Sequence, residues 1–124
     1  MNEFLEFKKR RLSQNEKVNA LENKNINRFY AIDSGVYREG ALGVRTKEML
    51  GLVASLVLRC EDCITYHLVR CVQEDCSDEE ISEIFSVGLI VGGSITIPEI
   101  RRATEKLAKL REMKANDENI DELL

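Results

Sequence analysis

The chain has 124 residues, 44% hydrophobic and 32% charged, with one proline and no tryptophan, which is the composition of a single globular domain. Its net charge of -4 argues against a nucleic-acid binder, and no apolar run is long enough to span a membrane. The N-terminus lacks a signal-peptide pattern, because acidic and basic residues interrupt its apolar ones. We therefore expect a cytoplasmic protein whose four cysteines are made in the reduced state.

Almost the whole chain is predicted to be helical, since strand-type alternation is nowhere sustained. A charged first helix is expected over residues 3–21, and its basic run at residues 8–11 is interpreted as a solvated face. Residues 23–25 look like a break, and a second helix is expected over residues 27–38 with Gly40 as its C-terminal cap. The apolar residues of this helix fall on one side: Phe29, Ile32, Val36 and Tyr37.

A third helix is expected to begin at Thr46, a capping residue, which puts Glu48 in its first turn. This helix is apolar nearly all round, so it should lie at the centre of the fold. The chain should then turn at residues 59–62 and form a fourth helix that ends near Glu74. Asp62 is the expected N-cap of this fourth helix, with Cys63 in its first turn.

Two more helices complete the prediction. Ser77 and Glu80 have the spacing of a capping box, which predicts the start of a fifth helix that carries the apolar residues Ile81, Ile84, Phe85, Leu89 and Val91. Its glycines, Gly88, Gly92 and Gly93, leave room for a neighbouring backbone. A break at residues 94–96 precedes a sixth helix with Pro98 in its first turn and a buried stripe of Ile100, Ala103, Leu107 and Leu110. The polar tail from Lys114 onward is expected to fray.

The chemistry of the chain is concentrated in eight residues. Cys60, Cys63 and His67, the only histidine, fall within this stretch, and Glu48 lies twelve positions before the first thiol. Two thiols three residues apart can form and reopen a disulfide, and a helix N-terminus or a nearby imidazolium favours the thiolate form. His67 lies one helical turn beyond Cys63, and it can exchange protons near neutral pH. This pattern predicts a redox-active dithiol site.

The spacing Glu-x11-Cys-x2-Cys-x3-His, met by Glu48, Cys60, Cys63 and His67, resembles that of the alkyl hydroperoxidase D-like branch of the carboxymuconolactone decarboxylase family. The segments at residues 40–50, 77–83 and 92–93 resemble neighbouring parts of that family. The resemblance implies an all-α helical bundle of about six helices that assembles into a homotrimer or homohexamer. It also implies a domain over residues 26–113, preceded by an N-terminal helical extension (1–25) and followed by an acidic tail (114–124).

The same resemblance implies a thiol-dependent peroxidase or disulfide reductase. Cys60 and Cys63 would be its catalytic dithiol, Glu48 and His67 its proton relay, and no cofactor would be bound. Cys63 is the expected attacking thiol because it has both the helix N-terminus and His67 beside it. The substrate would be a hydroperoxide, and a thiol or lipoyl-type donor would return the electrons. Asp62 stands where some family members have a second histidine, which removes one proton donor.

Other interpretations of the same residues stay open at this point. Two thiolates, an imidazole and a carboxylate could hold zinc, although no second cysteine or histidine pair is in view. The chain could also be a non-redox member of the family that binds a small acid or a metal, with structural cysteines, or an assembly module with a decayed site. Glu48 could serve only to complement the helix dipole. Cys71 and Cys76 are interpreted as packing residues. Packing is also the default interpretation of Tyr37 and Tyr66, with the lining of a substrate pocket as the alternative.

Overall fold

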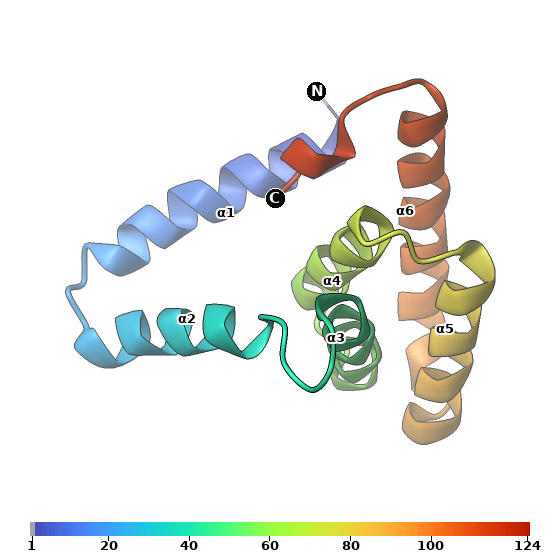
Figure 1. The fold of residues 1–124 in the computed structure, drawn as a ribbon, viewed down its shortest axis with the longest axis horizontal. Coiled ribbons are helices and arrows are strands. Elements are labelled where there is room, and N and C mark those ends of the chain that lie inside the picture. The colour runs from blue at the N-terminus through green and yellow to red at the C-terminus, as the bar shows by residue number, and fades with distance from the viewer. Residues whose placement is uncertain (1) are drawn as a thin grey trace.

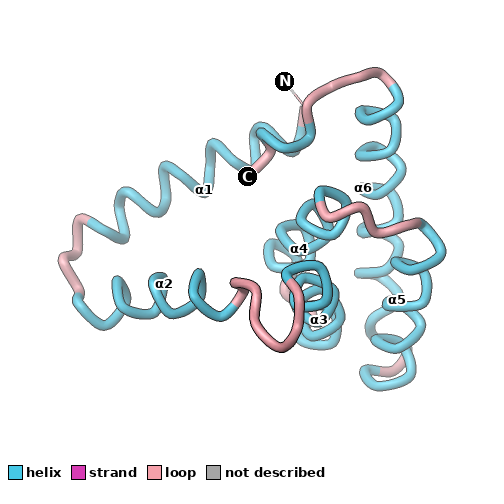
Figure 2. The backbone as a smooth tube through the Cα atoms, viewed as in Figure 1, coloured by secondary structure: helices cyan, strands magenta, loops and turns pink. Residues whose placement is uncertain are grey.

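The computed structural model describes residues 2–124, and within them every regular element is a helix, which confirms the all-α prediction. The α-helices are α1 (Glu3–Asn19), α2 (Lys24–Val36), α3 (Val44–Leu58), α4 (Glu61–Gln73), α5 (Asp78–Gly92) and α6 (Ile97–Ala115). Short 3₁₀ helices, η1 (Ser94–Thr96) and η2 (Ile120–Glu122), flank α6 (Figures 1 and 2). No helix in this part of the chain is long and apolar enough to cross a bilayer.

Helix α3 lies at the centre of a bundle with α4, α5 and α6, as its apolar sequence predicts (Figure 1). It packs most closely against α4 and α5, and Leu52 and Leu56 on it are fully buried. A Cβ atom on Gly88 of α5 would lie 2.5 Å from Leu56, so the glycine permits this close helix contact, as expected. The outer side of α3 is different, because Leu50 and Leu58 are exposed.

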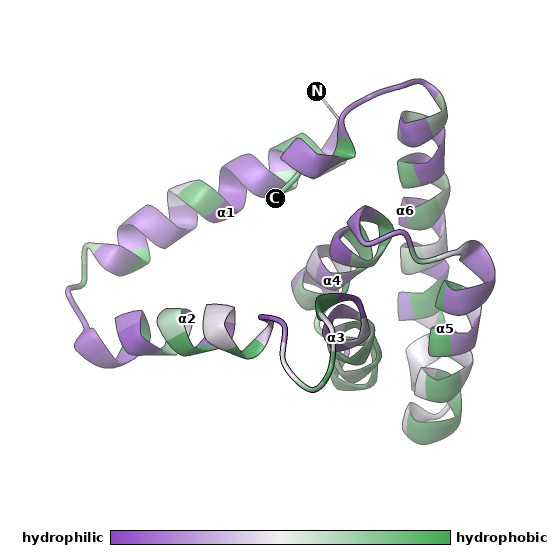
Figure 3. Cartoon of the chain, in the orientation of Figure 1, coloured by the Kyte–Doolittle hydropathy of each residue, from purple (hydrophilic) through white to green (hydrophobic). Residues whose placement is uncertain are grey.

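Helices α1 and α2 form an antiparallel pair that projects away from the bundle (Figure 1). The buried side chains of α1, Phe4 and Phe7, both lie near its start. Helix α2 has no buried residue at all. Its predicted apolar side is exposed instead: Phe29, Ile32 and Val36 are 66%, 65% and 57% accessible (Figure 3 shows the apolar colouring along the helix).

The predicted C-terminal cap of α2 is wrong. The helix ends at Val36, with Tyr37 rather than Gly40 as its C-cap. A lysine from α3 takes over the capping, since Lys47 Nζ donates hydrogen bonds to the carbonyls of Val36 (2.8 Å) and Arg38 (2.6 Å). A cation at the C-terminal end of a helix is favoured by the helix dipole, so this contact fastens the end of α2 to α3.

Two predicted helix starts are also wrong, and both bear on the site. Helix α3 begins at Val44, before the expected Thr46, so Glu48 lies in the second turn and dipole complementation does not explain it. The N-cap of α4 is Cys60 and not Asp62, because Cys60 takes the extended backbone of a cap and its sulfur accepts the Cys63 N–H at 3.3 Å. Cys63 lies in the first turn, as predicted.

The C-terminal half follows the prediction more closely. The capping box of Ser77 and Glu80 is present, and Pro98 lies in the first turn of α6. Within the expected stripe of α6, Ala103 and Leu110 are buried, and Ile100 and Leu107 are partly buried. On α5, however, Leu89 and Val91 are exposed.

The expectation of a frayed tail is wrong. Ile120 and Leu123 are buried in the core, and Gln73 Nε2 donates a hydrogen bond to the Ile120 carbonyl at 2.9 Å. The tail also meets α1, where Lys8 Nζ donates to the Glu122 carbonyl, so the tail lies beside the first half of α1 (Figure 1). Leu124, which is partly buried against the same core, adds to this contact, so the apolar residues of an otherwise polar segment dock it.

Candidate active site

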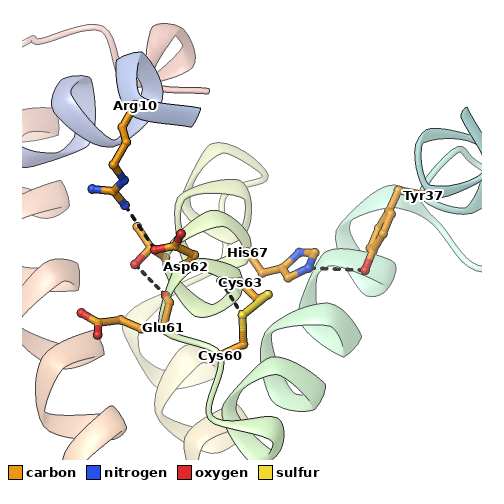
Figure 4. Close-up of a disulfide and its surroundings, with 8 residues drawn as sticks. Arg10, Tyr37, Cys60, Glu61, Asp62, Cys63 and His67 are labelled. Carbon is orange, nitrogen blue, oxygen red and sulfur yellow. Dashed lines mark hydrogen bonds and ion pairs between the residues drawn. A yellow bond between two sulfur atoms is a disulfide. The ribbon is translucent and has the colours of Figure 1, made fainter. Parts of the chain in front are cut away.

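The two motif cysteines are joined to each other at the start of α4. Cys60 and Cys63 form a disulfide with a Cα–Cα separation of 5.2 Å, a spacing at which cysteines are readily bridged (Figure 4). Cys60 is half-buried and Cys63 is exposed. The expectation that these two sulfurs can bond is therefore met, and Cys63 is the more accessible of the pair.

Glu48 and His67 lie together, and His67 borders the same pocket as Cys63. Glu48 comes from α3 and is 2% exposed, and its Oε2 atom lies 3.6 Å from Nδ1 of His67 on α4. Neither of these two atoms makes a hydrogen bond to any group within residues 2–124. Gly51 makes room for the imidazole, since a Cβ atom there would lie 2.7 Å from His67 Cε1.

Tyr37 is a site neighbour that the motif does not include. Its hydroxyl lies 3.4 Å from His67 Nε2, the nitrogen on the far side of the ring from Glu48 (Figure 4). Burial, together with the Glu48 carboxylate, raises the pKa of Tyr37, so the hydroxyl stays protonated beside the imidazole. The only sequence signal for Tyr37 is an aromatic residue at a helix end, which normally indicates packing.

Arg70 is the second neighbour that the motif misses. Its Nε atom lies 3.4 Å from Glu48 Oε2, the same oxygen that faces His67. Arg70 follows His67 by three residues on α4, so helical periodicity places both side chains on one face. This spacing is the sequence signal for Arg70. It points to the site only when α3 is known to place Glu48 opposite this face of α4.

An open pocket of about 400 Å³ adjoins the exposed thiol. Residues of α1, α2 and α4 line it, including Cys63, His67 and Tyr66. The Arg11 guanidinium lies 4.7 Å from the centre of the Tyr66 ring, and Tyr66 meets His67 edge to face. A small molecule in this pocket would reach Cys63 without any movement of the core.

The two acidic residues between the cysteines face away from them. Asp62 pairs with Arg10 at 3.2 Å, and Glu61 lies 3.6 Å from Lys106 Nζ (Figure 4 shows the Arg10 contact). Both carboxylates are largely exposed, as expected. These cations and the solvent weaken the repulsion that the two acids exert on a thiolate at the site.

The remaining cysteines belong to the core, as interpreted from the sequence. Cys71 and Cys76 are free and buried, and burial raises the pKa of both thiols. They are therefore poor nucleophiles. No group of three or more His, Cys, Asp or Glu side chains in the described part of the chain is arranged to hold a metal ion.

Comparison with known proteins places the chain in a family. The sequence profile of the carboxymuconolactone decarboxylase family matches residues 26–106. One crystal structure of a carboxymuconolactone decarboxylase family protein from Thermotoga maritima, described as having a possible part in an antioxidative response, is 57% identical over 93% of this chain and 97% of its own, with a TM-score of 0.89. A second crystal structure of that protein is 58% identical over 90% of this chain and 97% of its own, with a TM-score of 0.87.

A more distant structure shares the fold. A carboxymuconolactone decarboxylase family protein from Legionella pneumophila, in its apo form, is 21% identical over 88% of this chain and 97% of its own, with a TM-score of 0.77. The search of curated proteins found no match. The profile match spans well over half of the 124 residues, and together with the Thermotoga structures it shows that this chain belongs to the carboxymuconolactone decarboxylase family.

Proposed function

We propose that the protein is a thiol-dependent peroxidase whose Cys60–Cys63 dithiol reduces hydroperoxides. The observation that carries this proposal is the disulfide at the start of α4, with a half-buried His67 that faces the buried Glu48 and borders the same pocket as Cys63. The description of the Thermotoga relative, which mentions an antioxidative response, supports the same chemistry. The roles given below to these four residues are part of the proposal.

Cys63 is the thiol that attacks the peroxide. It is exposed, it borders the pocket, and it lies in the first turn of α4, where the helix dipole favours a thiolate. The thiolate attacks one peroxide oxygen, the O–O bond breaks, and Cys63 becomes a sulfenic acid. The other oxygen leaves as an alkoxide, or as hydroxide from hydrogen peroxide, and takes up one proton.

Cys60 then resolves the sulfenic acid. Its sulfur displaces the hydroxyl group of the sulfenic acid, a disulfide forms and water leaves. A donor dithiol, or two donor thiols, reopens the disulfide by attacking Cys63 and becomes a disulfide itself. Cys60 is suited to leave in that step, since its sulfur accepts the Cys63 N–H, which stabilises a departing thiolate. The reducing cytoplasm supplies such thiols.

His67 and Glu48 move the proton in this scheme. The imidazole takes the proton of the Cys63 thiol and later delivers one to the departing oxygen, while Glu48 orients the ring from its Nδ1 side. In the disulfide form Nε2 faces the Tyr37 hydroxyl. After reduction the Cys63 thiol, which borders the same pocket, competes with Tyr37 for that nitrogen.

The active form is a homotrimer or homohexamer in this proposal. The exposed apolar residues Phe29, Ile32 and Val36 of α2 form a face that nothing in the described chain covers. The same helix supplies Tyr30, Asp33 and Ser34 to the pocket beside Cys63. A second copy packed on this apolar face would hold that wall of the pocket in place.

A thiol titration tests the function. The fully reduced protein is treated with one equivalent of hydrogen peroxide or an alkyl hydroperoxide, and its fast-reacting thiols are counted before and after. We expect two fast thiols to be lost in the native protein and no disulfide to form in Cys63→Ser. If both fast thiols survive the peroxide, the proposed activity is wrong.

A further inference from the structure

We propose that Arg70 is a positioning residue that keeps the buried Glu48 carboxylate ionised, so that His67 is free to gain and lose its proton. This inference rests on the proposed function for its role in catalysis. The effect of Arg70 on the titration of His67 can be measured without any peroxide.

The need for a cation at this point follows from burial. Glu48 is 2% exposed, and a carboxylate removed from water takes up a proton unless a positive charge or hydrogen-bond donors compensate. Its Oε2 atom lacks a hydrogen bond within residues 2–124. Nearby positive charge is therefore what stabilises the ionised form at this oxygen.

The groups that face Glu48 differ in how they can supply that charge. His67 is positive only when it is protonated. Tyr37 and Cys71 also lie close enough for Glu48 to affect them, but they are neutral at physiological pH because the pKa of each is raised. Arg70 is charged at every relevant pH, and its Nε atom lies 3.4 Å from Oε2. Among the described residues, it is the one permanent cation within ion-pair distance of Glu48.

The guanidinium is held in this orientation from its other side. Its NH1 group donates to Gln73 Oε1 at 2.7 Å, and its NH2 group donates to Glu74 Oε1 at 3.0 Å. Gln73 is the last residue of α4 and Glu74 is its C-cap, so the end of the same helix directs Nε toward Glu48. A fixed charge of this kind acts in the same way in every step of a catalytic cycle.

The consequence concerns the proton on His67. Without Arg70, the Glu48 carboxylate would be balanced only by a proton shared within the Glu48–His67 pair, and that proton would be held more tightly. The imidazole would then remain charged to higher pH, where it cannot accept the Cys63 proton. With Arg70 present, Glu48 stays ionised whichever state His67 is in.

The test uses NMR, since His67 is the only histidine and its imidazole signals need no assignment. Arg70→Gln is compared with the native chain, with Arg70→Lys and with Arg102→Gln, a variant that removes an exposed arginine paired with Glu99 and, at 4.0 Å, with Glu61. We expect the midpoint of the imidazole titration to rise by about one pH unit in Arg70→Gln, because the variant removes a positive charge beside the carboxylate oxygen that faces the ring. Arg70→Lys should restore much of the native midpoint, and Arg102→Gln should leave it unchanged.

Circular dichroism checks whether Arg70→Gln is folded. If this variant does not fold, the Arg70→Lys titration is the second test. An unchanged or lowered midpoint in Arg70→Gln, or a rise as large in Arg102→Gln, overturns the inference. A folded Arg70→Gln should also show the low-pH limit of peroxide-driven thiol loss moved upward by the same amount. If the native protein loses no thiols to peroxide while the imidazole midpoint still rises in Arg70→Gln, the proposed function fails and the role of Arg70 beside Glu48 stands.

Discussion

Glu48 Oε2 lies 3.6 Å from His67 Nδ1 across the contact between α3 and α4, and both atoms lack a hydrogen-bond partner in the described chain. A carboxylate in the second turn of a central helix is not there to complement the helix dipole, because the first turn of α3 is formed by residues 44–47. Its burial therefore calls for another explanation, and the proton relay of the proposed site supplies one.

Gly51 gives a direct test of the space that His67 needs. Gly51→Ala places a methyl group 2.7 Å from the present position of Cε1, so the imidazole must move away from Glu48. Alanine favours a helix over glycine by about 0.5–1 kcal/mol, so helicity is retained. We expect at least a tenfold loss of peroxide-driven disulfide formation, measured by the rate of thiol loss.

A matched control for this change exists on α2. An added Cβ atom at Gly35 meets nothing within 4 Å, so Gly35→Ala should be as active as the native protein and at least as stable. Equal activity of the two alanine variants would show that the position of the imidazole does not matter.

Tyr37→Phe tests the contact on the other side of the ring. The change removes only the hydroxyl that lies 3.4 Å from Nε2 and keeps the ring packing, with its centroid separation of 5.3 Å. A neutral hydrogen bond contributes about 0.5–1.5 kcal/mol, so we expect the rate of peroxide-driven thiol loss to change by about twofold to tenfold. The control is Tyr30→Phe, because Tyr30 lines the pocket but makes no hydrogen bond or ring contact to His67 among the described residues. Identical rates in all three proteins would remove Tyr37 from the site.

Assembly is tested on the exposed face of α2. Ile32→Glu puts a charge on a side chain that is 65% exposed in the single chain, so the folded monomer tolerates it while an apolar interface does not. Light scattering should show a trimer or hexamer for the native protein and smaller species for the variant. Leu12→Glu, at an exposed position on α1, should keep the native size. A native protein that is monomeric, or a variant that assembles normally, contradicts the proposed interface.

The pH dependence of stability is tested at Glu80. Its hydrogen bond from Arg45 lowers the pKa of this carboxyl to about 2, so the stabilisation is complete above the unfolded value near 4.5 and is lost as pH falls from there toward 2. Glu80→Gln removes this charge. Its thermal midpoint should therefore fall less than that of the native protein between pH 5 and pH 2. Parallel curves for the two proteins would rule out this contribution.

The helices and the four motif residues could be predicted from the sequence because both depend on the spacing of residues along the chain. Helical periodicity identified α3 as central, and the Cys-x-x-Cys-x3-His pattern placed Cys60 and Cys63 at the start of a helix and His67 one turn further along it. What it missed depends on tertiary contacts. Arg70 matters only because α3 lies opposite it, and Tyr37 matters only because Lys47 fastens the end of α2.

The errors in the helix boundaries have similar causes. Cys60 replaces the expected Asp62 as the N-cap of α4, since a sulfur that accepts the Cys63 N–H serves where a carboxylate was expected. The tail docks through Ile120 and Leu123, two apolar residues that its polar composition conceals. The division of the chain at residues 25 and 113 stays a prediction.

The central claim is that Cys63 attacks the peroxide and Cys60 resolves it. The most direct measurement is to treat Cys60→Ser with hydrogen peroxide in the presence of a dione that traps sulfenic acids, and to locate the adduct by mass spectrometry. The account predicts one adduct, on Cys63, with Cys71 and Cys76 unmodified. An adduct confined to Cys71 or Cys76, or no adduct at all, would contradict it.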